Sequence, residues 1–176
     1  MLYLKQILKL RGKLSMDIVI RPYEIKDIPQ LTEIWNEIVD SAVAYPEEEP
    51  LKIDEAEEFF SSQTATICAC DGDIVLGFYI LHPNGYGRRS HICNTSYGVH
   101  SNCRGKGIGK KLVLDSFKRG KEYGFKILQY NCVVSVNEAA LNLYRSIGMV
   151  EVGRIENGYR LKDGTYCDGI IFTQQL

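Results

Sequence analysis

Three glycines alternate with other residues in the segment 104–110, which reads Arg-Gly-Lys-Gly-Ile-Gly-Lys. The segment lies between an apolar stretch typical of a strand and one typical of a helix. Glycines let a backbone approach a ligand closely, and the free N–H groups at a helix start, aided by the helix dipole, bind anions such as a pyrophosphate. A tight turn alone does not require Arg104, Lys106 and Lys110 beside three glycines. The segment therefore predicts a site for a phosphate-bearing cofactor.

Two other kinds of phosphate-binding turn fit this segment poorly. A nucleotide-hydrolase loop places a lysine and then a serine or threonine after its last glycine, whereas Gly109 is followed by Lys110 and Lys111. A dinucleotide-binding turn needs a longer glycine spacing and an acidic residue at the end of the next strand, and residues 127–134 contain no carboxylate.

The elements that must position this turn follow from switches between strand and helix periodicity. Asp71-Gly72-Asp73 indicates a hairpin, and Asp163-Gly164 joins the last two strands. Gly124 and Gly148 end helices. The expected order is a strand (18–21), two helices (28–38, 53–60), three strands (66–70, 74–81, 91–99), a helix (107–123), a strand (127–134), a helix (137–147) and two final strands.

Length and charge limit the classes of function. The 176 residues, 45% of them hydrophobic, suffice for one substantial core and are few for two. The 21 basic and 22 acidic residues give a net charge of −1, so we expect neither a nucleic-acid nor a membrane partner. No apolar stretch approaches the length that spans a bilayer. We expect residues 1–15 to be an N-terminal extension of unclear role, and residues 16–176 to form a single domain.

Six cysteines lie mostly in apolar runs and lack the paired spacing of a zinc site. We interpret them as reduced thiols of a cytoplasmic protein, with no metal, since free cysteine commonly behaves as a small buried hydrophobe. A metal or disulfide role is the alternative. The six are Cys68, Cys70, Cys93, Cys103, Cys132 and Cys167.

The pattern Arg104-x-x-Gly107-x-Gly109, after a strand that ends in Tyr97-Gly98-Val99 and before an apolar helix, resembles the signature of the GNAT superfamily of acyl-CoA-dependent N-acetyltransferases. The order of elements from Ile18 to Phe172 matches that fold. The resemblance implies an α/β (α+β) GNAT-like fold, with a mixed central sheet of about seven strands and helices on both faces. It also implies acetyl-CoA as co-substrate.

The same resemblance assigns residues to the co-substrate. Backbone groups at the end of the strand are expected to pair with the pantetheine arm, and N–H groups of the glycine turn with the pyrophosphate. An asparagine at the start of the last helix is expected to hydrogen-bond the co-substrate too. The expected residues are Tyr97, Gly98, Val99, Arg104, Gly105, Lys106, Gly107, Ile108, Gly109 and Asn137.

Tyr144 is the expected catalytic residue. It lies one turn beyond Ala140 in the motif Asn137-x-x-Ala140-x-x-x-Tyr144. In the GNAT family a tyrosine at this place often protonates the departing CoA thiolate, whose reference pKa resembles that of cysteine, about 8.5. The alternatives are that Tyr144 only packs in the core and that Asn137 only caps the helix.

A narrower resemblance rests on His91-Ile92-Cys93-Asn94, Tyr97, Asn131 and Asn137. These residues are similar to the branch that acetylates azetidine-2-carboxylate, with phosphinothricin acetyltransferases as broader relatives. The resemblance implies a small amino acid or analogue as acceptor. Asn94 and Asn131 stand in otherwise apolar strands, where a buried amide needs hydrogen bonds, so we expect them to bind substrate. The alternative is that each satisfies backbone groups of the sheet.

The mechanism expected is direct attack of a neutral amine on the thioester in a ternary complex, with a backbone N–H near Val99 stabilising the oxyanion. The base is an ordered water, His91 or a glutamate of the run 47–49. A cysteine nucleophile, Cys93 or Cys132, is the lesser alternative because neither has an evident base.

Two other functions compete with acetylation of a small amine. One is a non-catalytic CoA-binding sensor or interaction module, and the other is a peptide or protein N-terminal acetyltransferase. The segments 45–50 and 82–90 are expected to cover the acceptor site, which favours a small substrate. We also expect a homodimer, in which an exposed strand such as 169–173 extends the sheet between subunits.

Overall fold

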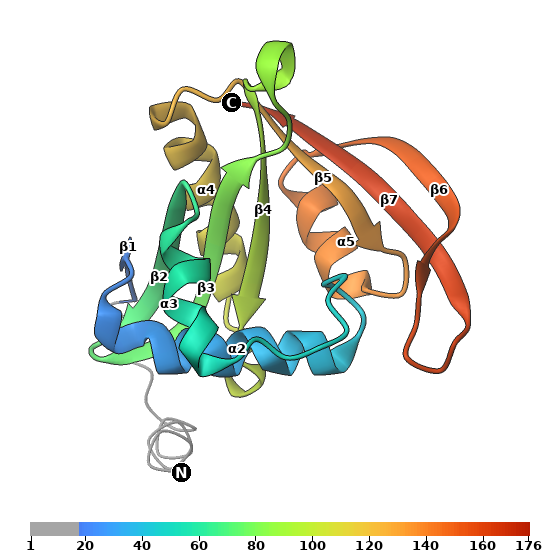
Figure 1. The fold of residues 1–176 in the computed structure, drawn as a ribbon. Helices are drawn as coiled ribbons and strands as arrows, with labels where there is room; N and C mark the ends of the chain where they lie inside the picture. The colour runs from blue at the N-terminus through green and yellow to red at the C-terminus, as the bar shows by residue number, and fades with distance from the viewer. Residues whose placement is uncertain (1–17) are drawn as a thin grey trace.

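The computed structural model describes residues 18–176 (Figure 1). The expectations for residues 1–15 and for a start at Met16 lie outside the described residues. The order of strands and helices confirms the predicted alternation. The elements are β1 (Val19–Pro22), α2 (Ile28–Ser41), α3 (Ile53–Ser61), β2 (Ala65–Asp71), β3 (Ile74–Pro83), β4 (Ile92–Val99), α4 (Ile108–Glu122), β5 (Ile127–Val134), α5 (Glu138–Ser146), β6 (Val150–Arg160) and β7 (Tyr166–Gln175), with short 3-10 turns at Ile25–Asp27, Gly87–Arg89 and Ser101–Cys103.

The strands form a seven-stranded mixed sheet in the order β1-β2-β3-β4-β5-β7-β6. Helices α2 and α3 cover one face, and α4 and α5 pack on the other (Figure 1). Because side chains alternate along a strand, Phe78 of β3 packs under α2 and α3 while its neighbour Tyr79 packs toward α4. The structure therefore has the mixed seven-stranded sheet with helices on both faces that the resemblance implied.

The sheet divides between β4 and β5. These two strands run parallel and pair only at Ile92 with Ile127 and Cys93 with Leu128. Beyond these pairs they diverge, and β5 carries an irregularity between Tyr130 and Val133. Among residues 18–176, the remaining edge of β4 has no strand partner on the β5 side, and the diverging strands leave space for a ligand.

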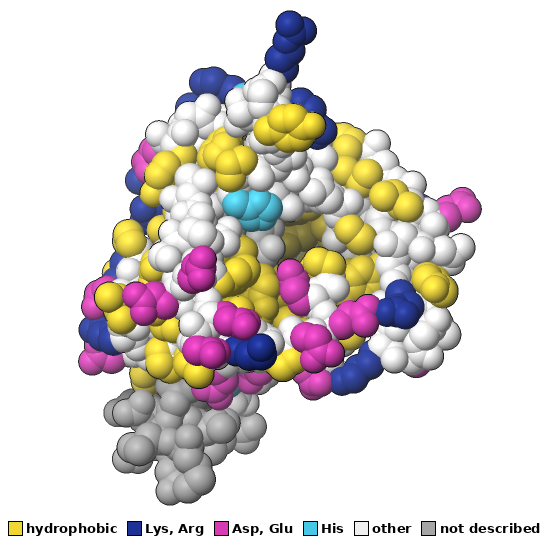
Figure 2. Space-filling model, in the orientation of Figure 1, with side chains coloured by type: hydrophobic (Ala, Val, Ile, Leu, Met, Phe, Trp, Pro, Cys, Tyr) yellow, Lys and Arg dark blue, Asp and Glu magenta, His cyan; other side chains and the backbone are white. Residues whose placement is uncertain are grey.

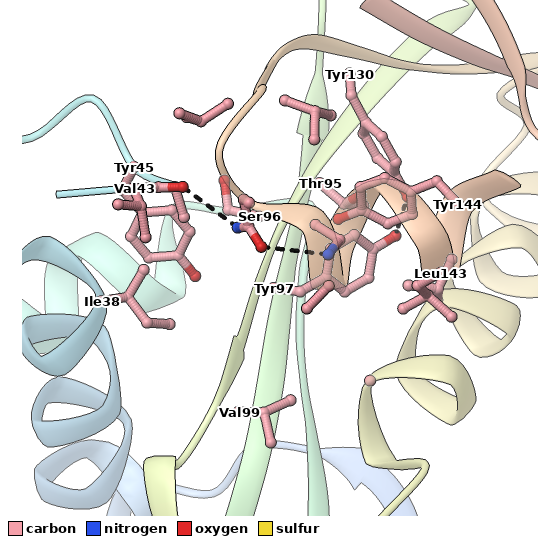
Figure 3. A pocket seen from close by; sticks show the side chains of 18 of the residues that line it. Ile38, Val43, Tyr45, Thr95, Ser96, Tyr97, Val99, Tyr130, Leu143 and Tyr144 are labelled. Carbon is pink, nitrogen blue, oxygen red and sulfur yellow. Dashed lines mark hydrogen bonds between the residues drawn. The ribbon is translucent and has the colours of Figure 1, made fainter. Parts of the chain in front are cut away.

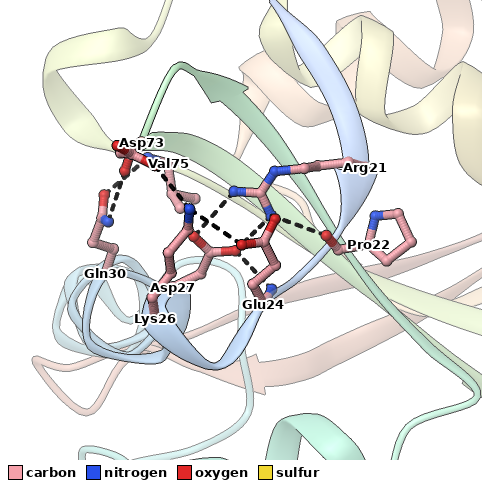
Figure 4. A network of polar contacts seen from close by, with 8 residues as sticks. All are labelled: Arg21, Pro22, Glu24, Lys26, Asp27, Gln30, Asp73 and Val75. Atoms are coloured by element: carbon pink, nitrogen blue, oxygen red, sulfur yellow. Dashed lines mark hydrogen bonds and ion pairs between the residues drawn. The ribbon is translucent and has the colours of Figure 1, made fainter.

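An ion pair between the partly exposed Arg21 and the buried Asp27 joins β1 to the start of α2 (Figure 4). The Asp27 side chain is fully buried and accepts two hydrogen bonds from Arg21, at 2.6 and 3.1 Å. It also accepts one from the Glu24 backbone N–H at 2.8 Å. Lys26 and Gln30 then connect the same segment to Asp73 in the β2–β3 turn. These bonds set the direction in which α2 crosses the sheet.

The expectation that residues 169–173 form an exposed strand is wrong. Strand β7 pairs with β5 on one side and with β6 on the other, and Ile170 and Phe172 are fully buried. The edge strand at this end is β6, which exposes Val150 and Val152. A homodimer built by sheet extension would thus use β6, and the homodimer itself stays a prediction. No helix among residues 18–176 is long and apolar enough to cross a membrane.

Candidate active site

A cleft of about 1060 Å³ opens where β4 and β5 diverge. Its walls come from the segment after α2, the exposed edge of β4, the glycine turn before α4, and the first turns of α5 (Figure 3). Figure 2 shows the hollow with apolar side chains inside and acidic side chains around part of its rim. Eleven of the residues predicted as site residues line it: Asn94, Tyr97, Val99, Arg104, Gly105, Gly107, Ile108, Gly109, Asn131, Asn137 and Tyr144.

Gly98 and Lys106 were predicted in the site but do not line the cleft. A Cβ atom on Gly98 would lie 2.7 Å from the Phe78 ring and 2.9 Å from Ile38. This glycine is therefore required for the close packing of α2 on β4, and its backbone is directed toward its partner Phe78 in β3 rather than into the cleft. Lys106 is exposed in the turn.

The glycine turn has the backbone geometry that anion binding requires. Gly105 and Gly107 have φ angles of +76° and +77°, a region that side chains with a Cβ rarely adopt. Gly107 is the residue before the first turn of α4, and Arg104 and Lys110 lie beside it in the cleft wall. The N–H groups at the start of α4, together with two cations, fit the pyrophosphate of acetyl-CoA.

The edge of β4 fits an amide-bearing chain. The His100 N–H donates to Leu76 and the Ile92 carbonyl accepts from Asn84, so even-numbered residues of β4 direct their backbone groups to β3. Tyr97 and Val99 consequently direct theirs into the cleft. The pantetheine arm of acetyl-CoA carries amides that match such an edge, so the residues present fit this co-substrate.

Gly107→Ala is expected to weaken acetyl-CoA binding about tenfold, since a left-handed alanine costs about 1–2 kcal/mol and shifts the turn. The measurement is the Kd for acetyl-CoA by calorimetry. Gly72→Ala is the matched control, because Gly72 has a φ of +59°, equally open space around its Cβ position, and a place in the β2–β3 turn. An equal loss of affinity in both variants would contradict the assignment of the turn.

Three tyrosines gather at the centre of the cleft (Figure 3). The Tyr97 hydroxyl lies 2.9 Å from that of Tyr130 and 2.6 Å from the Ser116 hydroxyl. The rings of Tyr130 and Tyr144 pack against each other, with 4.6 Å between their centroids, and the Tyr144 ring also contacts Phe172. Burial raises the pKa of Tyr144, so its phenol stays protonated at neutral pH. Tyr144 thus both packs in the core and presents a hydrogen-bond donor.

Asn137 is the cap of α5, and it has a second contact that the sequence did not predict. Its Oδ1 accepts a hydrogen bond from the Ala140 N–H at 3.2 Å. Its Nδ2 donates to the Val43 carbonyl at 3.3 Å, which ties the segment after α2 to the helix that carries Tyr144. Asn137 therefore does cap the helix, which is compatible with co-substrate contact, and that contact remains a prediction.

The two strand asparagines differ in environment. Asn94 is half-buried and its Oδ1 accepts a hydrogen bond from the Thr95 N–H at 2.8 Å. Asn131 was expected to be a buried amide, which is wrong, because it is exposed at the irregularity of β5. Its amide forms reciprocal hydrogen bonds of 2.9 and 2.7 Å with Asn84. Asn131 therefore reaches the cleft with its amide already paired.

Of the residues predicted as proton acceptors, some line the cleft and others do not. His91 is exposed and does not line the cleft, and Glu48 pairs with Arg160. Glu47 does line the cleft, and so does His82, which no sequence motif indicated.

The candidate nucleophile Cys93 is fully buried, and burial raises the pKa of its thiol to about 12. Its thiolate is therefore scarce at neutral pH.

Comparisons with known proteins agree with this geometry. The model of the acetyltransferase (GNAT) family matches residues 28–149. The N-acetyltransferase aca1 of Schizosaccharomyces pombe is 29% identical over 160 residues, covering 81% of this chain and 77% of that protein. A GCN5-related N-acetyltransferase from Kribbella flavida superposes with a TM-score of 0.83 and 26% identity, covering 90% of this chain and 98% of that one.

A phosphinothricin acetyltransferase from Sinorhizobium meliloti, solved in complex with acetyl-CoA, has the same fold, with a TM-score of 0.84, 24% identity and coverage of 92% and 89% of the two chains. The family model covers the segment from α2 through α5, including the glycine turn and the split between β4 and β5. The chain therefore belongs to the acetyltransferase (GNAT) family, whose members are N-acetyltransferases that use acetyl-CoA.

Proposed function

We propose that this protein transfers the acetyl group of acetyl-CoA to the amine of a small molecule, an amino acid or analogue, by direct attack in a ternary complex. One observation carries the proposal. The β4 edge, the glycine turn and the buried donor Tyr144 all line one cleft, and Trp35, Tyr45 and Phe59 line its α2 side (Figure 3). A pure CoA binder does not need a polar donor at that place.

Each wall has a task in this mechanism. Bound acetyl-CoA supplies an acetyl group activated as a thioester. Arg104, Lys110 and the N–H groups at the start of α4 hold its pyrophosphate. The β4 edge at Tyr97 orients the arm. The Val99 N–H, directed into the cleft, stabilises negative charge that develops on the carbonyl oxygen.

Tyr144 assists the departure of the thiolate. A thiol has a reference pKa of about 8.5, below that of any tyrosine. Because burial raises the pKa of Tyr144 further, complete proton transfer to the sulfur is uphill unless the thiolate is equally buried. Tyr144 therefore acts chiefly by donating a hydrogen bond to the sulfur as charge develops on it.

The acceptor amine must lose a proton. Glu47 and His82 line the cleft, and we expect one of them to receive this proton, directly or through a water. Acidic side chains around the rim favour the approach of a cationic amine (Figure 2). Trp35, Tyr45 and Phe59 give the α2 side of the cleft an apolar aromatic lining, which we expect to suit a small acceptor better than a peptide.

The test is acetyl-CoA turnover with a panel of amines, scored by release of the CoA thiol. The panel contains azetidine-2-carboxylate, proline, methionine derivatives, phosphinothricin, polyamines and short peptides. We expect turnover with at least one small amino acid or analogue. Release only with peptides would favour a peptide N-terminal acetyltransferase. Binding of acetyl-CoA without any amine-dependent release would favour a non-catalytic CoA-binding protein.

A further inference from the structure

Tyr45 carries a buried hydroxyl that the mechanism above does not use. Its side chain lines the cleft and is 5% exposed. The ring packs on Trp35, with 4.4 Å between centroids. The hydroxyl has no hydrogen-bond partner among the protein atoms of residues 18–176. Buried polar groups in native proteins are nearly always paired, so an unpaired hydroxyl on a side chain of the cleft wall points to a partner from outside the protein, such as a bound ligand.

The position of this hydroxyl is held from two sides. Helix α2 ends at Ala42, whose left-handed conformation (φ +50°) turns the chain toward the cleft. The Val43 carbonyl accepts from Asn137, and the Tyr45 carbonyl accepts a 2.5 Å hydrogen bond from the Tyr159 hydroxyl. Figure 3 shows Tyr45 on the α2 side of the cleft, across from Tyr97 and Tyr144. The hydroxyl therefore cannot easily turn away to solvent.

The surroundings define the kind of atom that would pair with this hydroxyl. Burial raises the pKa of Tyr45, so the group is a neutral O–H whose best partner is a carboxylate or carbonyl oxygen. The cations of the cleft wall, Arg104 and Lys110, belong to the glycine turn and the start of α4. Glu47, two residues from Tyr45 and also in the wall, is placed to attract an ammonium group. An amine with a neighbouring oxygen acceptor matches both groups.

We propose that Tyr45 is a specificity-determining residue, which donates a hydrogen bond to the carboxylate or carbonyl oxygen next to the acceptor's amine. This inference rests on the proposed acetyl transfer to a small amine. An acceptor without that oxygen leaves the buried hydroxyl unpaired, which a site built for hydrogen bonding penalises strongly. The enzyme would thus select α-amino acids and their amides over simple amines of the same skeleton.

The experiment compares wild type with Tyr45→Phe on three acceptors of one skeleton: azetidine-2-carboxylate, its carboxamide, and azetidine. For the variant we expect kcat/KM to fall about 10- to 100-fold with the first two, mainly through KM, and to stay within about twofold with azetidine. Tyr86→Phe, which removes the same hydroxyl from a side chain 93% exposed and outside the cleft, is the matched control. Calorimetry with the CoA-saturated protein measures acceptor binding without turnover.

An equal fall in kcat with all three acceptors would assign the hydroxyl to the transferring acetyl group and overturn the inference. Unchanged kinetics in the variant would overturn it as well. If wild type acetylates none of the three, the proposed function fails on these acceptors, and calorimetry decides the role of Tyr45. Weaker binding of the two oxygen-bearing acceptors to Tyr45→Phe would still support it, and equal binding, or none to either protein, would overturn it.

Discussion

Replacing Tyr144 by phenylalanine is expected to lower kcat about 100-fold, which is the lower end of the range for a positioned acid or base. The Kd for acetyl-CoA is expected to stay within about twofold. The variant keeps the ring that packs against Tyr130 and Phe172, so it removes only the hydroxyl. The measurement is steady-state CoA release at saturating acetyl-CoA, with calorimetry for the Kd.

The pH profile separates this role from packing. A phenol donates only below its pKa, and burial raises that of Tyr144 above the ordinary value of about 10. The ratio of wild-type to variant kcat should therefore stay constant from neutral pH to about pH 10. Tyr166→Phe, at a side chain 60% exposed and outside the cleft, should turn over like wild type. If Tyr144→Phe turned over at the wild-type rate, the Tyr144 hydroxyl would have no role in thiolate departure.

Asp27→Ala is expected to lower the free energy of unfolding by about 3 kcal/mol, since it removes a fully buried carboxylate to which three donors bind, and hydrogen bonds to charged groups contribute about 1.5–3 kcal/mol. Asp27 is fully buried and loses three hydrogen bonds, two from Arg21 and one from the Glu24 N–H. Urea denaturation followed by circular dichroism measures the loss.

The matched control for this stability change is Asp73→Ala. Asp73 pairs with Lys26 in the same network, but its side chain is 87% exposed. An exposed pair contributes about 0–1 kcal/mol, so this variant should lie close to wild type. If the two aspartates proved equally costly to remove, burial would not be the reason for the effect of Asp27.

The sequence predicted the order of elements and the anion-binding turn because both are local. Hydrophobic periodicity placed α4 and α5 within one residue of their observed ends, and Gly107 has the left-handed conformation that a glycine-rich turn before a helix implies. These features depend on neighbouring residues along the chain and on the ability of glycine to adopt a positive φ angle, both of which can be recognised in the sequence.

The sequence did not predict features that depend on pairing between distant strands. Asn131 lies on the same side of β5 as Gln129, and its exposure depends on the separation of β5 from β4, which pair only at Ile92 and Cys93. The place of β7 inside the sheet follows from its pairing with both β5 and β6, which no local pattern records. Tyr45 was predicted only as part of a covering loop, since its burial depends on Trp35, ten residues earlier.

The contacts of the segment after α2 (residues 42–50) limit how far the cleft can widen. At its narrow end the two halves of the sheet are joined by the β4–β5 pairs, and at its open end by the bonds from Asn137 and Tyr159 to this segment. Lys162 adds an ion pair to Asp40 at 2.6 Å. Because the cleft is joined both at its apex and across its mouth, it resists spreading, and we expect its width to stay nearly the same when acetyl-CoA and the acceptor bind.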